Sequence, residues 1–267
     1  MELDSIYSNQ ADYIQSLVRY QHGGFVYGLY QGNLFNSVFQ PIVDRTGELF
    51  AFEGLVRIKD SLNNMIHTGD YFSSLKPGDK ANVVTTLLCA KLHSINLAHT
   101  PHRDRKLFIN VSPSVFSLLA NHLQAIEYLL LRLKCLRMSC SQIVYEITEF
   151  EDSDLSGIVE GKRRLAEHGI ATALDDYGTH YSTRARALQI RSPYLKIDRS
   201  FVGDQQFVRQ AVELAQQIGA KTIAEGIETE QEYWLCRECG VDYFQGYWVA
   251  RPMESQKLEQ YQLLTQV

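Results

Sequence analysis

The chain has 267 residues, of which 45% are hydrophobic and 21% charged, so it can bury one large core or two small ones. Its formal net charge of -5 argues against a nucleic-acid duplex as partner, because proteins that bind duplexes carry basic patches. No run approaches the ~20 consecutive apolar residues that span a membrane, and the start MELDSIYSNQADY is too polar for a signal peptide. We therefore expect a cytoplasmic protein that contacts neither membrane nor duplex.

Short apolar, β-branched runs alternate with longer amphipathic stretches along the chain. This alternation is typical of βα units around a parallel sheet. The predicted strands are 37–44, 48–58, 106–112, 142–148, 169–176, 193–198, 220–226 and 241–247. The predicted helices between them include 114–134, 154–168, 204–218 and 228–239.

The connection between the first two predicted strands is Asp44-Arg45-Thr46-Gly47. Four residues are too few for a crossover helix, so these strands should form an antiparallel hairpin. The fold class is therefore α/β, a modified TIM-type (β/α)8 barrel with the first strand antiparallel. Residues 1–34, rich in Tyr, Gln and Gly, are expected to be an N-terminal extension, either an arm, a dimer contact or a linker. Residues 35–267 are expected to form the barrel domain.

Polar residues stand at the carboxyl end of most predicted strands. They are Glu53, Asn110, Glu146, Asp175, Asp176, Lys196, Asp198, Glu225 and Gln245. In a barrel these ends meet at one face, where active sites of the fold lie. Oxygen ligands favour Mg2+ or Mn2+, and an Asp-Asp doublet can serve two ions, the arrangement that suits phosphoryl displacement. Lys196 either orients the attacking water or forms a salt bridge to a ligating carboxylate.

The five cysteines are an odd number, which predicts free thiols in a reducing compartment. Cys236 and Cys239 form a CxxC inside a helical pattern, and with Cys135 and Cys140 they would make a zinc site only if the fold joined the two pairs. Buried helix cysteines are the better interpretation.

Nine short motifs together resemble the EAL-domain family of cyclic-di-GMP phosphodiesterases, in family order and over about residues 35–255. They are FQPIV (39–43), EGLVR (53–57), INVS (109–112), EITE (146–149), DDYGT (175–179), LKIDRSFV (195–202), AEGIET (224–229), QGY (245–247) and RP (251–252). A single motif of this length is weak evidence, whereas the ordered set is strong.

The resemblance implies a role for each matching residue. The metal ligands would be Glu53, Asn110, Glu146 and Asp175 for one ion and Asp175 and Asp176 for the second, with Glu228 supporting this set from the end of strand 220–226. The catalytic group would be Lys196, which handles the attacking water, Glu225, which orders the site, and Glu149, which braces the loop after strand 169–176. The substrate contacts would be Gln40, Leu55, Arg57, Gln245 and Pro252.

The expected activity is hydrolysis of cyclic-di-GMP to linear pGpG with two Mg2+ or Mn2+ ions, with calcium inhibitory and a homodimer as the assembly. Two alternatives stay open: a silent cyclic-di-GMP receptor or protein-interaction module, and a barrel enzyme with another substrate. Two residues depart from the family pattern. Gly54 replaces the signature alanine and is expected to change packing only, while His180 replaces a loop glycine and is expected to tune loop closure or to be a tolerated surface residue.

Overall fold

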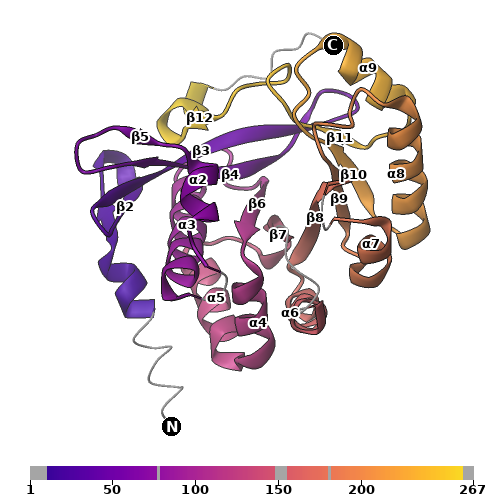
Figure 1. The fold of residues 1–267 in the computed structure, drawn as a ribbon. Coiled ribbons are helices and arrows are strands. Elements are labelled where there is room, and N and C mark those ends of the chain that lie inside the picture. The colour runs from indigo at the N-terminus through magenta and orange to yellow at the C-terminus, as the bar shows by residue number, and fades with distance from the viewer. Residues whose placement is uncertain (1–10, 77–78, 148–154, 180–181, 261–267) are drawn as a thin grey trace.

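The computed structural model describes residues 11–76, 79–147, 155–179 and 182–260. Its described strands are β1 (Val18–Tyr20), β2 (Val26–Tyr30), β3 (Asn33–Asp44), β4 (Leu49–Lys59), β5 (Met65–Ile66), β6 (Lys106–Val111), β7 (Ile143–Ile147), β8 (Ala171–Tyr177), β9 (Tyr194–Ile197), β10 (Lys221–Ala224), β11 (Tyr243–Phe244) and β12 (Met253–Glu254). All of them belong to one sheet, which curls into a barrel (Figure 1).

Eight of these strands close the barrel in the order β3-β11-β10-β9-β8-β7-β6-β4, and β4 pairs back to β3. β3 runs antiparallel to both of its barrel neighbours, β4 and β11. The other six pairs are parallel: β4–β6, β6–β7, β7–β8, β8–β9, β9–β10 and β10–β11. The predicted modified barrel with an antiparallel first strand is therefore confirmed.

The β3–β4 hairpin forms where the sequence predicted it. The Asp44 carboxylate accepts hydrogen bonds from the backbone nitrogens of Thr46, at 2.8 Å, and Glu48, at 3.0 Å. Gly47 has φ 83, a left-handed angle that glycine adopts without steric cost. These contacts fix the turn and the register in which Gln40 lies opposite Glu53.

In the described part of the chain, eight α-helices follow β5 and pack outside the barrel strands (Figure 1). The longer ones are α3 (Lys80–Ala98), α4 (Pro113–Asn121), α5 (Leu123–Cys135), α6 (Leu155–Glu167), α8 (Gln205–Ile218) and α9 (Glu230–Glu238), and the short ones are α2 (Thr68–Ser73) and α7 (Arg184–Ile190) lying beside them. The predicted single helix over 114–134 is wrong, because His122 takes extended backbone angles (φ -132, ψ 103) and separates α4 from α5.

The barrel interior is built in two layers, because alternate residues of a strand point to the same face. One layer is apolar and fills the barrel like a plug. It consists of Ile42, Ala51, Phe108, Val144, Ala173, Tyr194, Ile223 and Tyr243. Two residues along from each of them stands a polar side chain: Gln40, Glu53, Asn110, Glu146, Asp175, Lys196, Glu225 and Gln245. The apolar plug thus closes one end of the barrel and leaves the polar layer at the carboxyl ends of the parallel strands.

Residues ahead of the barrel extend its sheet and cover α3. The chain is helical over residues 11–16, and then β1 and β2 add an antiparallel ribbon to the first part of β3. Ile14, Val18 and Val26 are buried in one cluster with Leu88 and Leu92 of α3. The proposed division between an extension and a barrel domain at residues 34 and 35 stays a prediction.

The cysteines form no disulfide, as expected for free thiols. The thiols of Cys236 and Cys239 donate to the backbone oxygens of Val202 and Gln205, so they behave as buried helix cysteines. Among the described residues, the only cluster able to hold a metal is acidic and contains no cysteine. In the part of the chain that the structure describes, every helix is too short or too polar to cross a membrane.

Candidate active site

Lys196 lies at the centre of the polar layer. Its ammonium nitrogen is 2.8 Å from Asp175 Oδ1, 2.7 Å from Glu225 Oε1 and 4.0 Å from Glu53 Oε1, and it also contacts Glu146 Oε1. The Lys196 and Glu146 side chains are 1% and 0% exposed. The fold therefore brings together four predicted carboxylates from four different strands around one buried cation.

Glu53 is fixed by neutral donors as well as by Lys196. Asn110 Nδ2 donates to Glu53 Oε1 at 2.8 Å, and Gln245 Nε2 donates to Glu53 Oε2 at 2.6 Å. Gln40 Nε2 donates to the backbone oxygen of Ala250 at 3.2 Å and so ties β3 to the segment after β11. Amide donors on both oxygens hold the Glu53 carboxylate in one orientation.

The electrostatics of this cluster are those of a crowded acidic site. Burial by itself would lower the pKa of Lys196, but the surrounding carboxylates outweigh it and raise the pKa well above its ordinary value. Burial and the neighbouring carboxylates raise the pKa of Glu146 and of Glu225 well above the ordinary range. Burial opposes ionisation of Glu53 too, yet Lys196 and the amide donors lower its pKa. One ammonium thus faces more acidic groups than it can neutralise.

A bulge in β8 aims two consecutive aspartates at the same side. Neighbouring residues of a regular strand point to opposite faces, but the β8–β9 register shifts between Leu174 and Tyr177, and Asp176 takes a left-handed φ of 49. Bulges re-aim side chains in this way, and aspartate tolerates this angle better than most residues. As a result, oxygen atoms of Asp175, Asp176 and Glu225 lie within 4.8 Å of one another.

This donor set fits divalent cations that prefer oxygen. The three grouped carboxylates offer oxygen ligands only, which suits Mg2+ and Mn2+ better than zinc. Glu146 Oε2 is buried and has no hydrogen-bond donor among the described residues, a costly state for a carboxylate oxygen. Cations beside these groups would offset both the excess charge and the missing donor.

The predicted substrate residues of β4 follow the metal cluster along the same strand face. Leu55 and Arg57 are two and four residues beyond Glu53, and both are partly buried. Arg57 lines a cleft of about 550 Å³ together with Asn36 of β3 and residues 254–257. Pro252 is partly buried between β11 and β12. The cleft thus contains a guanidinium, the group that pairs best with phosphate oxygens.

Of the remaining predicted residues, one is exposed and two fall outside the described ranges. Glu228 forms an ion pair with Arg199 at 2.9 Å, and both side chains are about half or more exposed, at 49% and 66%. Its support of the metal ligands stays a prediction. Glu149 and His180 fall outside the residues that the structure describes, and the roles expected for them stay predictions as well.

His93 of α3 is a site neighbour that the sequence did not single out. It is buried, its Nδ1 is 2.8 Å from Ser37 Oγ, and its ring covers the backbone of Gly54, directly after Glu53. A methyl group on Gly54 would lie 2.7 Å from His93 Cγ. The glycine at residue 54, where the family has alanine, was the one sign of this contact in the sequence. The missing methyl group leaves space that the His93 ring occupies.

Comparisons with known proteins agree with this geometry. The sequence profile of the EAL domain matches residues 28–252. The cyclic di-GMP phosphodiesterase PA2567 of Pseudomonas aeruginosa is 30% identical over 240 residues, which cover 84% of this chain and 39% of that protein. The chain spans 31% and 33% of the length of two further curated relatives, so it corresponds to one part of these larger proteins.

Solved structures share the fold. A standalone EAL protein from Vibrio cholerae O395, in its c-di-GMP bound form, has a TM-score of 0.70 at 25% identity, over 83% of this chain and 93% of that one. Klebsiella pneumoniae BlrP1 in a manganese/c-di-GMP complex has a TM-score of 0.71 at 23% identity, over 89% and 59%. The calcium complex of BlrP1 has a TM-score of 0.69 at 22% identity, over 83% and 56%. The chain therefore belongs to the EAL-domain family of cyclic-di-GMP phosphodiesterases.

Proposed function

We propose that this protein hydrolyses one phosphodiester bond of cyclic-di-GMP and releases linear pGpG, with two Mg2+ or Mn2+ ions as cofactors. The observation that carries the proposal is the convergence of five carboxylates on the carboxyl ends of the barrel strands, around Lys196. Membership of the family and the manganese and c-di-GMP in the BlrP1 complex support the same chemistry.

The ligand assignment follows from the resemblance to the EAL-domain family, and the grouping of Asp175 and Asp176 supports part of it. Glu53, Asn110, Glu146 and Asp175 would hold one ion, and Asp175 with Asp176 would hold the other. When bound, two such ions neutralise the charge of the phosphate and lower the pKa of a water molecule. Lys196 Nζ keeps its proton, because the carboxylates raise its pKa. As an ammonium it orients the carboxylates and the attacking water and does not act as the base.

The substrate would be held by neutral and cationic groups above the acidic cluster. The Arg57 guanidinium would pair with the phosphate that is not cleaved, and Gln40 and Gln245 would present amides beside Glu53. Gln245 Oε1 is buried and accepts no hydrogen bond from a described residue, so it is an available acceptor. These groups orient the ring of the dinucleotide so that one phosphodiester faces Lys196 and the ions.

An active phosphodiesterase can be distinguished from a receptor that binds cyclic-di-GMP without hydrolysing it. A receptor needs the groups that bind substrate, whereas turnover also needs the carboxylates and Lys196, all of which are in place here. We expect the purified protein to convert cyclic-di-GMP to pGpG with Mg2+ or Mn2+, followed by nucleotide chromatography, and EDTA to abolish the conversion. Tight binding of intact cyclic-di-GMP under every metal condition would instead support the receptor.

The assembly that fits the family resemblance is a homodimer formed near the loop after β8 and helix α7. The resemblance alone supports this part of the proposal. Light scattering across a concentration series would measure it, with a dimer mass expected and a monomer mass at all concentrations counting against it.

A further inference from the structure

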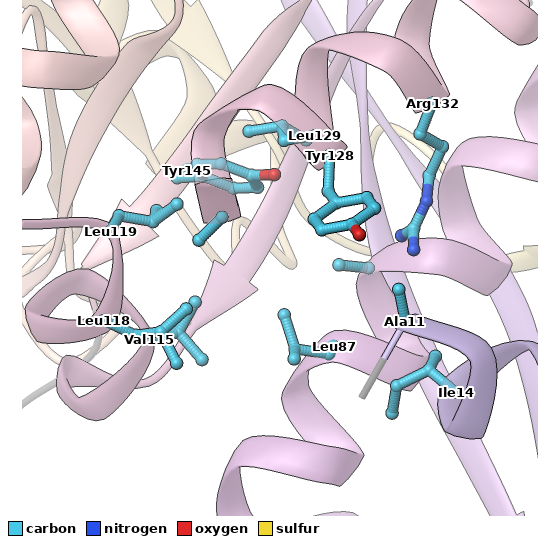
Figure 2. A pocket seen from close by; sticks show the side chains of 12 residues that line it. Ala11, Ile14, Leu87, Val115, Leu118, Leu119, Tyr128, Leu129, Arg132 and Tyr145 are labelled. Carbon is cyan, nitrogen blue, oxygen red and sulfur yellow. The ribbon is translucent and has the colours of Figure 1, made fainter. Parts of the chain in front are cut away.

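A second cavity lies on the outside of the barrel, between its wall and the surrounding helices (Figure 2). It holds about 100 Å³ and is formed by α3, α4, α5, the helical residues 11–16 and Tyr145 of β7. Tyr145 and Glu146 are consecutive on β7, so they point to opposite faces of that strand. The cavity is therefore separated from the candidate active site by the barrel wall.

The walls of this cavity are almost entirely apolar. Leu87 of α3, Val115 of α4 and Leu129 of α5 contribute aliphatic surface, and the ring of Tyr128 stands in the middle of the opening (Figure 2). Tyr128 is 41% exposed, so one side of the cavity is open to solvent. These walls suit a short hydrocarbon chain or a small ring.

Arg132 places a positive charge at the edge of these apolar walls. Its guanidinium reaches from α5 toward the side of the cavity formed by Ala11 and Ile14 (Figure 2). It forms no hydrogen bond or ion pair with any residue that the structure describes, although burial lowers its pKa. A partly desolvated guanidinium with five donors and no acceptor is costly unless an anion joins it.

Lys91 adds a second cation near Arg132. It is 7% exposed, and neither a hydrogen bond nor an ion pair joins it to another residue within the described ranges. Burial and the charge of Arg132 lower its pKa to about 8, and Asp12 acts in the opposite direction. Two cations that repel each other across a buried region attract an anion more strongly than either does alone.

We propose that this cavity is a binding site for a small amphipathic carboxylate, with its apolar tail between α3, α4 and α5 and its carboxylate on the Arg132 guanidinium. The cavity of about 100 Å³ is smaller than an apolar cavity of 150 Å³ that holds benzene, but its open side lets a chain of a few carbons extend beyond it. The site does not depend on the proposed hydrolysis, because its lining residues take no part in that site.

Hexanoate is a suitable probe, and its binding can be measured by isothermal titration calorimetry on the full chain. The matched probe is hexanol, which has the same tail without the charge. We expect hexanoate to bind and hexanol to bind at least about tenfold more weakly, since a charge-assisted hydrogen bond contributes roughly 1.5 kcal/mol or more, which is about tenfold.

Three variants locate the binding. Arg132→Met keeps the bulk of the side chain, removes its charge and should weaken hexanoate binding about tenfold. Ala125→Leu, on the partly buried rim, should block the tail while leaving Tm near the wild-type value. Arg209→Met on the exposed face of α8 is the matched control and should leave affinity unchanged.

Several results would overturn the proposal. If hexanol binds as tightly as hexanoate, the cavity binds apolar molecules without recognising a carboxylate. If Arg132→Met binds hexanoate with unchanged affinity, Arg132 is not the partner of the carboxylate. A loss in Arg209→Met equal to that in Arg132→Met would mean general attraction to positive charge. No hexanoate binding to the folded wild-type protein would remove the site altogether.

Discussion

Gly54→Ala tests the packing behind the candidate active site with a single methyl group. The new Cβ would lie 2.7 Å from His93 Cγ and 2.9 Å from both Cβ and Cδ2 of His93, distances that real Cβ atoms do not tolerate. Rotation of the His93 side chain would relieve the contacts with Cγ and Cδ2 but not the contact with Cβ, which is fixed to the α3 backbone. Either α3 must move away from β4 or the ring must leave Ser37, its 2.8 Å partner.

Both responses cost free energy of unfolding. Overpacking a core costs about 1–3 kcal/mol, and loss of the buried Ser37–His93 hydrogen bond adds about 1 kcal/mol. We expect Gly54→Ala to lower the free energy of unfolding by about 2–3 kcal/mol, equivalent to a Tm decrease of roughly 4–12 °C in a domain of this size. Turnover should fall too, because a shift of β4 moves Glu53.

Urea unfolding followed by circular dichroism measures the loss. Gly203→Ala is the matched control, since a Cβ there meets no atom within 4 Å. The double variant Gly54→Ala/His93→Ala should be more stable than the sum of the single effects by about 1–3 kcal/mol, because the methyl group fills space vacated by the ring. A Gly54→Ala protein within about 0.5 kcal/mol of wild type, or strictly additive effects, would refute this reasoning.

Further predictions concern the site and its ionisation. Lys196→Ala should lower kcat by at least ~100-fold, the range for a group that positions a transferred proton, with substrate affinity within a few-fold, and a variant that keeps most of its kcat would contradict the role. Glu53→Ala and Asp175→Ala should each lose metal binding, measured by calorimetry, together with turnover, and a variant that loses only one of the two would count against a ligand role. Calcium should compete with Mg2+ and inhibit, because its looser coordination disturbs the spacing of two ions, and full turnover with calcium alone would exclude this. Burial lowers the pKa of His93 from 6.5 to about 4, so its neutral ring contributes stability that is complete above pH 6.5 and lost as pH falls toward 4, worth about 3 kcal/mol. His93→Asn should flatten that part of the stability–pH curve, and an unchanged curve would contradict the assignment.

Much of the barrel could be predicted, because each of its strands combines apolar residues of the plug with one polar residue two positions away. The run VYEIT around Glu146 and the run TALDDY around Asp175 show this pattern in the sequence itself. Strands of this kind are recognisable because burying an acidic residue in an apolar run is costly without a partner or metal.

The ribbon before the barrel was harder to predict. β2 alternates buried Val26, Gly28 and Tyr30 with more exposed residues, a period-2 signal that its glycine and tyrosine content obscured. β3 begins at Asn33, earlier than the predicted residue 37, because its first residues pair with β2. Such pairings depend on residues distant in space, which a local pattern does not report.

The arrangement within the site also depends on tertiary contacts. The sequence indicated Asp175 and Asp176 as a pair, but strand alternation alone would point them to opposite faces. The β8 bulge and the left-handed angle of Asp176 place them on one side. Likewise, the contact of His93 with Gly54 joins α3 to β4 across many residues, and only the folded chain reveals it.

The most direct test of the proposed function is hydrolysis in heavy-oxygen water. Incubation of the protein with cyclic-di-GMP and Mg2+ or Mn2+ should give pGpG whose terminal phosphate carries one heavy oxygen atom, detected by mass spectrometry. The Asp175→Ala variant and EDTA-treated protein should give none. Recovery of intact, protein-bound cyclic-di-GMP with every cation would contradict the account and identify the chain as a receptor.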